Sequence, residues 1–254
     1  MRKSSKLGIF RVGFACLCLI ALATTAIHAD DEMLADKSQL AGYGEEVARL
    51  VNQKDEIVSQ LRNGMIVIVR RVPSPVVAVR GYAMTGGVYE GQWLGGGLSH
   101  LLEHLVAGGS NSRRTEEQNR NLLQAIGNDS NAYTTTDHTA FFVNTTPEHL
   151  DQAIDLVTGW MLTAEITEPE YRREYQVVQR ELEMDKGNPD FVFAQLTNVN
   201  RYHVNSERVP VIGYQEVIQG LKVEDVRNYY HLAYQPNNIV FAVAGNLDPE
   251  TMLK

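Results

Sequence analysis

The sequence predicts an α+β domain over residues 56–254, in which a mainly antiparallel sheet packs against helices. Three observations support this prediction. Runs of β-branched and aromatic residues are bounded by turn dipeptides, segments with a helical apolar period lie between and after them, and no repeat, low-complexity segment or linker divides residues 56–254. The 254 residues are 44% hydrophobic and 21% charged, which is the composition of a globular chain long enough for one or two domains.

The strands are predicted from apolar, β-branched runs that end at turn signals. Asn63-Gly64 separates the first two runs, and this dipeptide tolerates the positive φ angles of a tight hairpin. Gly86-Gly87 ends the third run. The predicted strands cover residues 57–61, 65–72, 76–85, 131–145 and 238–244.

The helices are predicted from apolar periodicity together with capping residues. Thr115 can cap a helix with Gln118 three residues later, and Pro169 suits the first turn of a long helix that Gly187 closes. The predicted helices cover residues 40–51, 98–107, 115–126, 146 to at least 161, 168–186, 190–203, 214–219 and 223–232, and another begins at 248.

The first 29 residues follow the pattern of an export signal. Four basic residues lie within the first eleven positions, an apolar run covers residues 12–27, and small residues precede the polar pair Asp30-Asp31. We expect cleavage after Ala29, with Ala26 as the second candidate. A retained membrane anchor is the alternative, because the apolar run is near the length that spans a bilayer. Residues 30–55 then form a polar lead-in that contains the short helix over 40–51.

The cysteine content and the net charge restrict the cellular compartment and the partners that can be expected of the mature chain. Cys16 and Cys18 both lie in the expected signal, so cleavage would leave no cysteine and no disulfide. An exported chain without disulfides suits a bacterial periplasm, with secretion or signal anchoring as alternatives. Loss of residues 1–29 removes four positive charges and no negative ones, which takes the formal charge from −8 to −12. This balance argues against a nucleic-acid partner, and no stable membrane span is expected after cleavage.

The segment 100–104 has the composition of a helical metal site. His100 and His104 are four residues apart, so on a helix both imidazoles project from one face, and Glu103 points to the same side. Zinc takes two imidazoles and a carboxylate with one position left for water, and an unligated glutamate beside it can accept a proton from that water. The order His-x-x-Glu-His is a known zinc-peptidase signature. An exposed helix with two solvated histidines is the alternative.

A third ligand has to come from another segment. The predicted helix 168–186 contains Glu174, Glu181 and Glu183, of which Glu174 and Glu181 are two turns apart and share a face. Charged residues on a helix are more often a solvated surface than a ligand set. The residues alone therefore leave the choice among these glutamates open.

The chain resembles, from about residue 57 to residue 248, the pitrilysin/insulinase family of zinc metallopeptidases, which includes the mitochondrial processing peptidases. The resemblance rests on several motifs in the same order along the chain. These are Asn63-Gly64, Gly96-Gly97-Leu98-Ser99 leading into residues 100–104, Asn131-Ala132-Tyr133-Thr134, Glu174, Val177-Val178, Glu181, Tyr234-Gln235-Pro236-Asn237-Asn238 and Gly245.

The resemblance implies a site with one zinc ion. The family's third ligand is a glutamate some seventy-odd residues after the second histidine, and Glu181 lies 77 residues after His104. The resemblance also implies that Glu174 is a supporting acidic residue of the catalytic site. Asn131 and Ala132 would lie on the strand edge against which family members lay an extended peptide. Without the resemblance, Asn131 is a turn residue at the start of a strand.

The implied activity is that of a zinc-dependent metalloendopeptidase acting on peptides or unfolded segments. Glu103 would take the proton of the attacking water and later pass it to the leaving amine. A non-catalytic scaffold or binding subunit that retains the fold is the alternative, and a different hydrolase or lyase with the same ligands is a third reading.

The resemblance further implies that this chain is the N-terminal, metal-binding half-domain of a larger peptidase. Family members pair it with a second, similarly folded half, on the same chain or on a partner subunit, and the two halves enclose the substrate. The helix expected from 248 stops at Lys254, so we expect a domain truncated at its C-terminal end and a chain that is a fragment of a longer protein. A partner subunit that supplies the remainder is the alternative.

Overall fold

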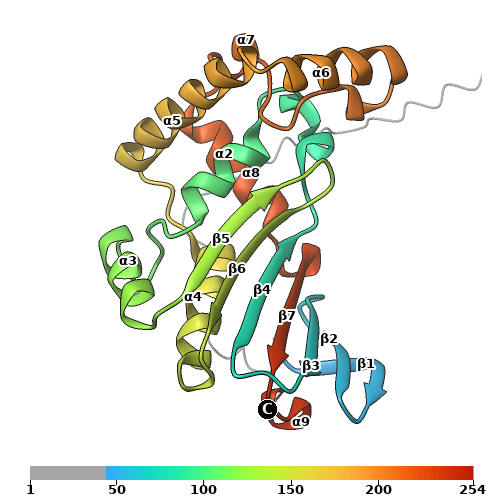
Figure 1. Cartoon of the computed structure of the whole chain (residues 1–254), viewed down its shortest axis with the longest axis vertical. Coiled ribbons are helices and arrows are strands. Elements are labelled where there is room, and N and C mark those ends of the chain that lie inside the picture. Colours follow the sequence, from blue (N-terminus) through green and yellow to red (C-terminus); the bar gives the residue numbers. More distant parts are fainter. Residues whose placement is uncertain (1–43, 254) are drawn as a thin grey trace, which may run out of the picture.

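The computed structural model describes residues 44–253, which form one seven-stranded sheet with helices behind it and at one end in the view of Figure 1. The strands are β1 (Glu46–Gln53), β2 (Glu56–Leu61), β3 (Ile66–Arg71), β4 (Val77–Ala83), β5 (Asp129–Thr134), β6 (Thr139–Thr145) and β7 (Ile239–Gly245). The helices are α2 (Leu98–Val106), α3 (Glu116–Ala125), α4 (Leu150–Thr163), α5 (Glu168–Lys186), α6 (Pro189–Arg201), α7 (Gln215–Ile218), α8 (Val223–Ala233) and α9 (Pro249–Met252).

The strand order is β1-β2-β3-β7-β4-β6-β5. Every neighbouring pair in this sheet is antiparallel except β3 with β7, which run parallel. Strand β7 comes from the far end of the sequence and lies between β3 and β4. The predicted α+β class with a mainly antiparallel sheet is confirmed. Among the strands of residues 44–253, β5 lies at the edge of the sheet and pairs only with β6.

The helix expected over residues 40–51 is wrong where the structure describes it, because residues 46–53 form strand β1. Val47 and Val51 are β-branched, and β1 pairs antiparallel with β2 along its whole length. Its position is fixed by Glu46, which accepts hydrogen bonds from Arg49 on the same strand and from Ser59 on β2. Pairing with β2 and these side-chain contacts outweigh a weak local helical period.

The single strand expected over residues 131–145 is in fact the hairpin β5–β6. Thr135 closes its turn, because its backbone N–H donates to the carbonyl of His138 at 2.8 Å and its hydroxyl accepts from the N–H of His138 at 3.1 Å. Neither glycine nor proline marks this turn, so the run of threonine and aromatic residues conceals it. The other predicted helices and strands are confirmed to within a few residues.

Residue Gly97 sets how helix α2, which carries His100 and His104, begins. It has φ +63° and ψ +30°, a left-handed conformation that side chains other than glycine rarely adopt. A Cβ at this position would lie 2.3 Å from the carbonyl oxygen of Ile212. The absence of a side chain thus lets the segment 209–213 pack directly against the start of α2.

A hydrophobic core joins the sheet to the helices that carry the site. Leu101 and Leu105 of α2, Val178 and Leu182 of α5, and Tyr229 of α8 belong to one buried cluster. Figure 1 shows α2 and α5 together at the end of the sheet away from α9, and the two helices are in contact. The core therefore fixes their relative positions.

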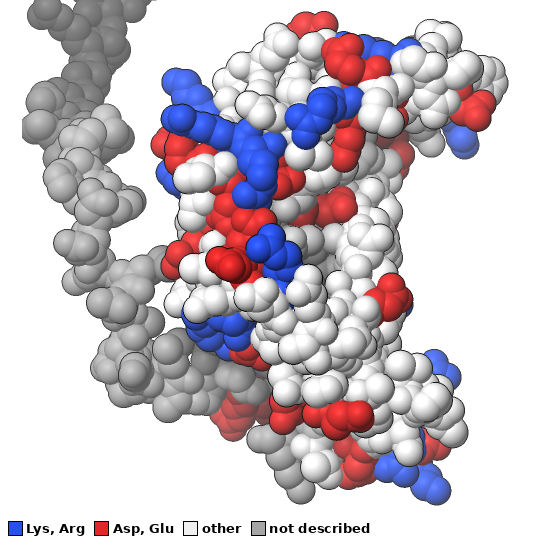
Figure 2. All heavy atoms as spheres, turned by 60° about the vertical axis from the view of Figure 1, so that its left-hand side comes forward, with Lys and Arg blue, Asp and Glu red and all other residues white. Residues whose placement is uncertain are grey.

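The expected export signal over residues 1–29, and the lead-in as far as residue 43, lie outside the described residues. Within residues 44–253, no helix is both long enough and apolar enough to cross a bilayer. Figure 2 shows acidic and basic side chains next to one another on the face in view.

Candidate metal centre

Helix α2 brings the two histidines together as the four-residue spacing predicts. The Nε2 atoms of His100 and His104 are 3.3 Å apart, and each side chain is 18% exposed. The opposite face of α2 is anchored by buried leucines of the core. The Nε2 atoms of His100 and His104 therefore point toward the same place at the surface of the core.

Helix α5 adds a carboxylate at the same point. Oε2 of Glu181 is 3.7 Å from Nε2 of His100 and 3.4 Å from Nε2 of His104. Glu181 lies between the buried Val178 and Leu182, which pack α5 against α2. The three donor atoms lie within 4.8 Å of one another, and no other group of three such side chains meets this criterion among the described residues.

The donor set fits a zinc ion. Ligand atoms placed about 2.0–2.2 Å from a tetrahedral zinc are roughly 3.3–3.6 Å apart, which is close to the separations observed here. Burial, together with the neighbouring His104, lowers the pKa of His100 to about 4. His100 is therefore neutral near pH 7 and has a lone pair available for a metal.

Glu103 lies beside this cluster without belonging to it. Its Oε2 accepts a hydrogen bond of 2.7 Å from the hydroxyl of Thr134 at the end of β5. Burial raises the pKa of Glu103, and the hydrogen bond from Thr134 opposes that rise. A half-buried, oriented carboxylate outside the group of three donor atoms has the properties expected of a general base.

Glu174 contacts the far side of His104. Its Oε2 is 3.5 Å from Nδ1 of His104, while its Oε1 accepts a hydrogen bond of 2.8 Å from Arg173, which also pairs with Glu116 of α3. The contact with Glu174 raises the pKa of His104 and lowers that of Glu174. A carboxylate on the second ring nitrogen of a ligand orients the ring. For His100, no described residue accepts a hydrogen bond from Nδ1.

We predict that Glu174→Gln weakens zinc binding without abolishing it. The amide keeps the size of the side chain but loses the charge that orients His104, and the loss of such a partner lowers metal affinity about 10- to 100-fold. Competition with a chromophoric chelator measures the affinity. Glu168→Gln is the matched control, since Glu168 is exposed at the start of the same helix. An unchanged affinity in Glu174→Gln would show that Glu174 does not support the metal.

Glu90 holds the first turn of α2 from beneath. Its carboxylate accepts hydrogen bonds from the backbone N–H groups of Gly97, at 3.0 Å, and Ser99, at 2.9 Å, and the residue is 1% exposed. Ser99 also bonds Tyr229 of α8. Burial raises the pKa of Glu90 from 4.5 to about 7, although the backbone hydrogen bonds oppose the rise. Ser99, which precedes His100, is thus held by hydrogen bonds at both its backbone and its side chain.

A pH-dependent contribution to stability follows from Glu90. Between pH 4.5 and about 7 the folded chain retains a proton that the unfolded chain has released, so this contribution is complete below pH 4.5 and is lost as the pH rises through 7. The variant Glu90→Gln lacks this pH-dependent contribution to stability. We expect the free energy of unfolding of the native sequence to fall more steeply than that of Glu90→Gln from about pH 5 to 7.5 in denaturant titrations. Glu183→Gln should keep the native slope, and equal slopes in all three proteins would contradict the assignment.

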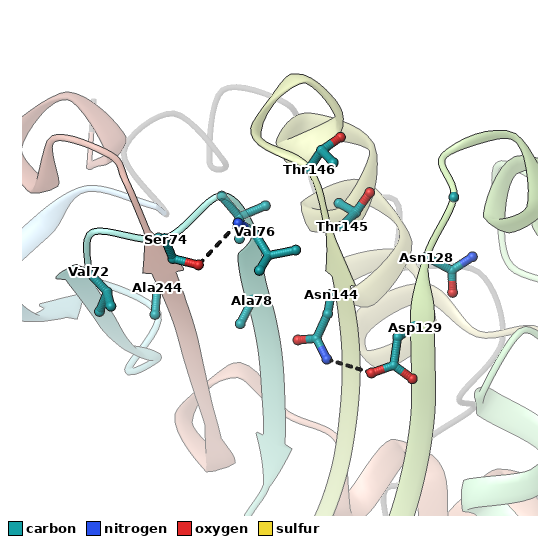
Figure 3. Close-up of a pocket in the computed structure, with 13 residues that line it drawn as sticks. Val72, Ser74, Val76, Ala78, Asn128, Asp129, Asn144, Thr145, Thr146 and Ala244 are labelled. Carbon is teal, nitrogen blue, oxygen red and sulfur yellow. Dashed lines mark hydrogen bonds between the residues drawn. The ribbon is translucent and has the colours of Figure 1, made fainter.

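The predicted substrate residues lie next to the same centre. Asn131 is exposed and Ala132 half-buried on the edge strand β5, and both line a pocket of about 340 Å³ that also touches Glu103 and His104. A pocket of about 580 Å³ lies elsewhere, at the other end of the sheet, and Figure 3 shows the residues that line it. It contains the hydrogen-bonded pair Asn144 and Asp129 and no histidine. Of these two pockets, the smaller one adjoins the candidate metal centre.

The structure brings together all seven site residues named from the sequence, and adds three. Thr134, Arg173 and Glu90 orient Glu103, Glu174 and the start of α2 respectively. Thr134 lies within a motif that the sequence already marked. Arg173 and Glu90 carry no motif signal, because an Arg-Glu neighbour pair is common on helices and because Glu90 accepts from backbone N–H groups.

The fold is that of a protease half-domain. The chain superposes on the first half of the periplasmic protease PqqL from Escherichia coli with a TM-score of 0.71 and 22% identity, over 81% of this chain and 46% of the other. It superposes on a protease from Helicobacter pylori with a TM-score of 0.73 and 24% identity, over 78% and 48% of the two chains.

The chain belongs to the insulinase family of peptidases. The profile described as "Insulinase (Peptidase family M16)" matches residues 65–210, and one described as "Peptidase M16 inactive domain" matches residues 220–254. An uncharacterized zinc protease of Bacillus subtilis is 27% identical over 187 residues, which are 73% of this chain and 45% of that protein. The mitochondrial-processing peptidase subunit beta of Caenorhabditis elegans is 26% identical over 79% of this chain and 43% of its own. The chain thus spans less than half the length of these relatives.

Proposed function

We propose that this chain is the metal-binding half of a zinc-dependent metalloendopeptidase. The main support is geometric: nitrogen atoms of His100 and His104 and an oxygen of Glu181, from two helices, converge beside a carboxylate that is not one of them. Relatives named as zinc proteases support the same activity. Of the matched regions, the one described as inactive begins at residue 220, beyond every proposed ligand.

Some of the proposed residues would hold the metal, and another would transfer a proton. A bound zinc ion would supply a Lewis acid that acidifies a water molecule and polarises the scissile carbonyl. His100, His104 and Glu181 would hold it, and Glu174 would orient His104. Glu103, held by Thr134, would accept the proton of the water and deliver it to the nitrogen of the leaving amine.

The proposed substrate is an extended peptide or an unfolded segment. The outer edge of β5 has no partner strand among the described residues, and Asn131 and Ala132 lie on it directly beside Glu103. A peptide added along this edge would form backbone hydrogen bonds that do not depend on its sequence.

We also propose that a second half completes the enzyme and that the protein is exported. The relatives are about twice as long as the matched region, so a similar half on the same chain or on a partner subunit would enclose the peptide. The pattern of residues 1–29 and the likeness to a periplasmic protease support export. Mass spectrometry of the mature protein should find Asp30 at its N-terminus, whereas a start at Met1 would contradict cleavage.

The hydrolysis of internally quenched peptides by the purified full-length protein tests the proposed activity. We expect cleavage that stops when a chelator removes the metal and returns with stoichiometric zinc. Cleavage that persists in the chelated protein would rule out the proposal. A non-catalytic scaffold that retains this fold is the competing function, and stable zinc binding without any cleavage would favour it.

A further inference from the structure

Helix α6 presents three large apolar side chains to solvent. Val192, Phe193 and Leu196 are 41%, 71% and 56% exposed. They lie within about 100° of one another around the helix axis, because an α-helix turns by about 100° per residue. We call these three residues the α6 stripe. Single apolar residues scatter over any soluble surface, whereas several on one face of one helix are typical of a contact surface.

The other face of α6 belongs to the surroundings of the candidate metal centre. Phe191, Ala194 and Asn198 line a pocket of about 470 Å³ that also touches His100 and Glu181. By the same helical period, these lining residues lie on the opposite side of the helix axis from the α6 stripe. Helix α6 is thus a wall of this pocket, and the stripe lies on the outer side of that wall.

The packing of α6 within the described residues is sparse. None of its residues is buried, and its main contacts are with α5 and with the 3₁₀ turn Ser206–Arg208. Figure 1 shows α6 beside α5 at the end of the molecule away from α9. A helix of 13 residues is marginal in water without the packing of an apolar face. A further surface against the α6 stripe would therefore stabilise the helix.

The charges of α6 indicate what kind of surface this is. The helix carries one acidic residue, Asp190, and one basic residue, Arg201. Helices that bind anionic lipid carry several basic residues beside their apolar face, because these residues attract the headgroups. An apolar stripe with balanced and sparse charge is instead typical of the centre of a protein–protein or interdomain contact.

The relatives indicate which protein surface is available. The zinc protease of Bacillus subtilis matches this chain over only 45% of its own length, so a single chain of that protein also contains the remainder. The second half proposed above has to cover the metal centre in order to enclose a peptide there. A cover over the pocket that touches His100 and Glu181 would meet α6, because α6 is a wall of that pocket.

We propose that the α6 stripe is the contact surface for the second half of the protein, carried on the same longer chain, and that this contact closes the pocket beside His100 and Glu181. This rests on the proposed function, which supplies the second half. It goes beyond that function in assigning the contact to Val192, Phe193 and Leu196. The matching surface of the second half is apolar and uncharged.

Photo-cross-linking of the full-length protein tests this contact. The substitution Phe193→p-benzoylphenylalanine keeps an aromatic ring at the stripe, and mass spectrometry after irradiation and proteolysis identifies the residues that it reaches. We expect cross-links to residues beyond 254. The matched control is the same substitution at Leu232, which is 70% exposed on α8 as a single apolar side chain. It should give few cross-links to that region.

The double variant Val192→Asp with Leu196→Asp should break the contact. Loss of the burial of each large apolar side chain weakens an association equilibrium about 10- to 100-fold, and an unpaired buried carboxylate opposes the contact further. The cross-link yield from position 193 should therefore fall by roughly 10-fold or more. Leu232→Asp is the matched control and should leave the yield unchanged. Zinc content should stay native in both proteins, because the candidate ligands lie on α2 and α5.

The outcomes also separate this inference from the function on which it rests. Cross-links confined to residues 1–254, of the same molecule or of an isotope-labelled second copy, would overturn the assignment. Equal yields from positions 193 and 232 would do the same, and so would cross-links to phosphatidylglycerol vesicles. Peptide cleavage without cross-links beyond 254 would refute the contact and keep the peptidase function. Such cross-links in a protein that cleaves nothing would support the contact and refute the activity.

Discussion

Glu103→Gln is expected to abolish peptide hydrolysis while the protein keeps its fold and its zinc. Glu103 is separate from the three donor atoms, so the change removes a proton acceptor and leaves the ligand set intact. The amide can still accept the hydrogen bond from Thr134, which preserves the local structure. A positioned general base contributes about 10²- to 10⁴-fold, and we expect kcat to fall by at least that range.

Measurements of zinc content and of turnover on the same preparation test this prediction. Glu183→Gln provides the matched control, because Glu183 is exposed on α5 and pairs with Lys186. Its turnover should equal that of the native sequence. Native turnover in Glu103→Gln with zinc still bound would mean that another group accepts the proton.

Glu181→Ala is expected to remove zinc from the protein. The two imidazoles of α2 alone would leave the ion with too few protein ligands. The carboxylate of Glu181 on α5 is the nearest further donor. The loss should exceed the roughly 100-fold that the removal of a supporting residue causes. Because Glu181 is partly exposed, at 39%, the fold should tolerate the change.

Two substitutions on α5 discriminate between ligand assignments in this experiment. Glu183→Ala should retain native zinc affinity, and Glu174→Ala should lose only part of it. If Glu174→Ala lost the metal while Glu181→Ala kept it, then Glu174 would be the third ligand and the present assignment would be wrong. Equilibrium dialysis at fixed free zinc measures all three variants.

The histidine pair and its base could be predicted from the sequence because they depend on local geometry alone. Residues 100, 103 and 104 share a face of any helix, and Gly97 permits that helix to start where it does. Glu181 could not be chosen over Glu174 by the same reasoning, since both occupy one face of α5 and only the packing of α5 on α2 decides which is nearer. The family resemblance supplied that choice.

The errors in the predicted fold have a common cause. Strand β1 depends on its pairing with β2, and the turn of the β5–β6 hairpin depends on side-chain hydrogen bonds rather than on glycine or proline. The same holds for Arg173 and Glu90, whose roles appear only when their partners are in place. Local patterns predicted the candidate residues of the site, while the supporting contacts required the tertiary structure.

Anomalous diffraction at the zinc absorption edge from crystals of the zinc-loaded protein tests the proposed metal centre most directly. We predict a single strong peak about 2.0–2.2 Å from Nε2 of His100, Nε2 of His104 and a carboxylate oxygen of Glu181, with Glu103 not bonded to the metal. A peak elsewhere in the chain, or one bonded to Glu174 in place of Glu181, would contradict the assignment of the site.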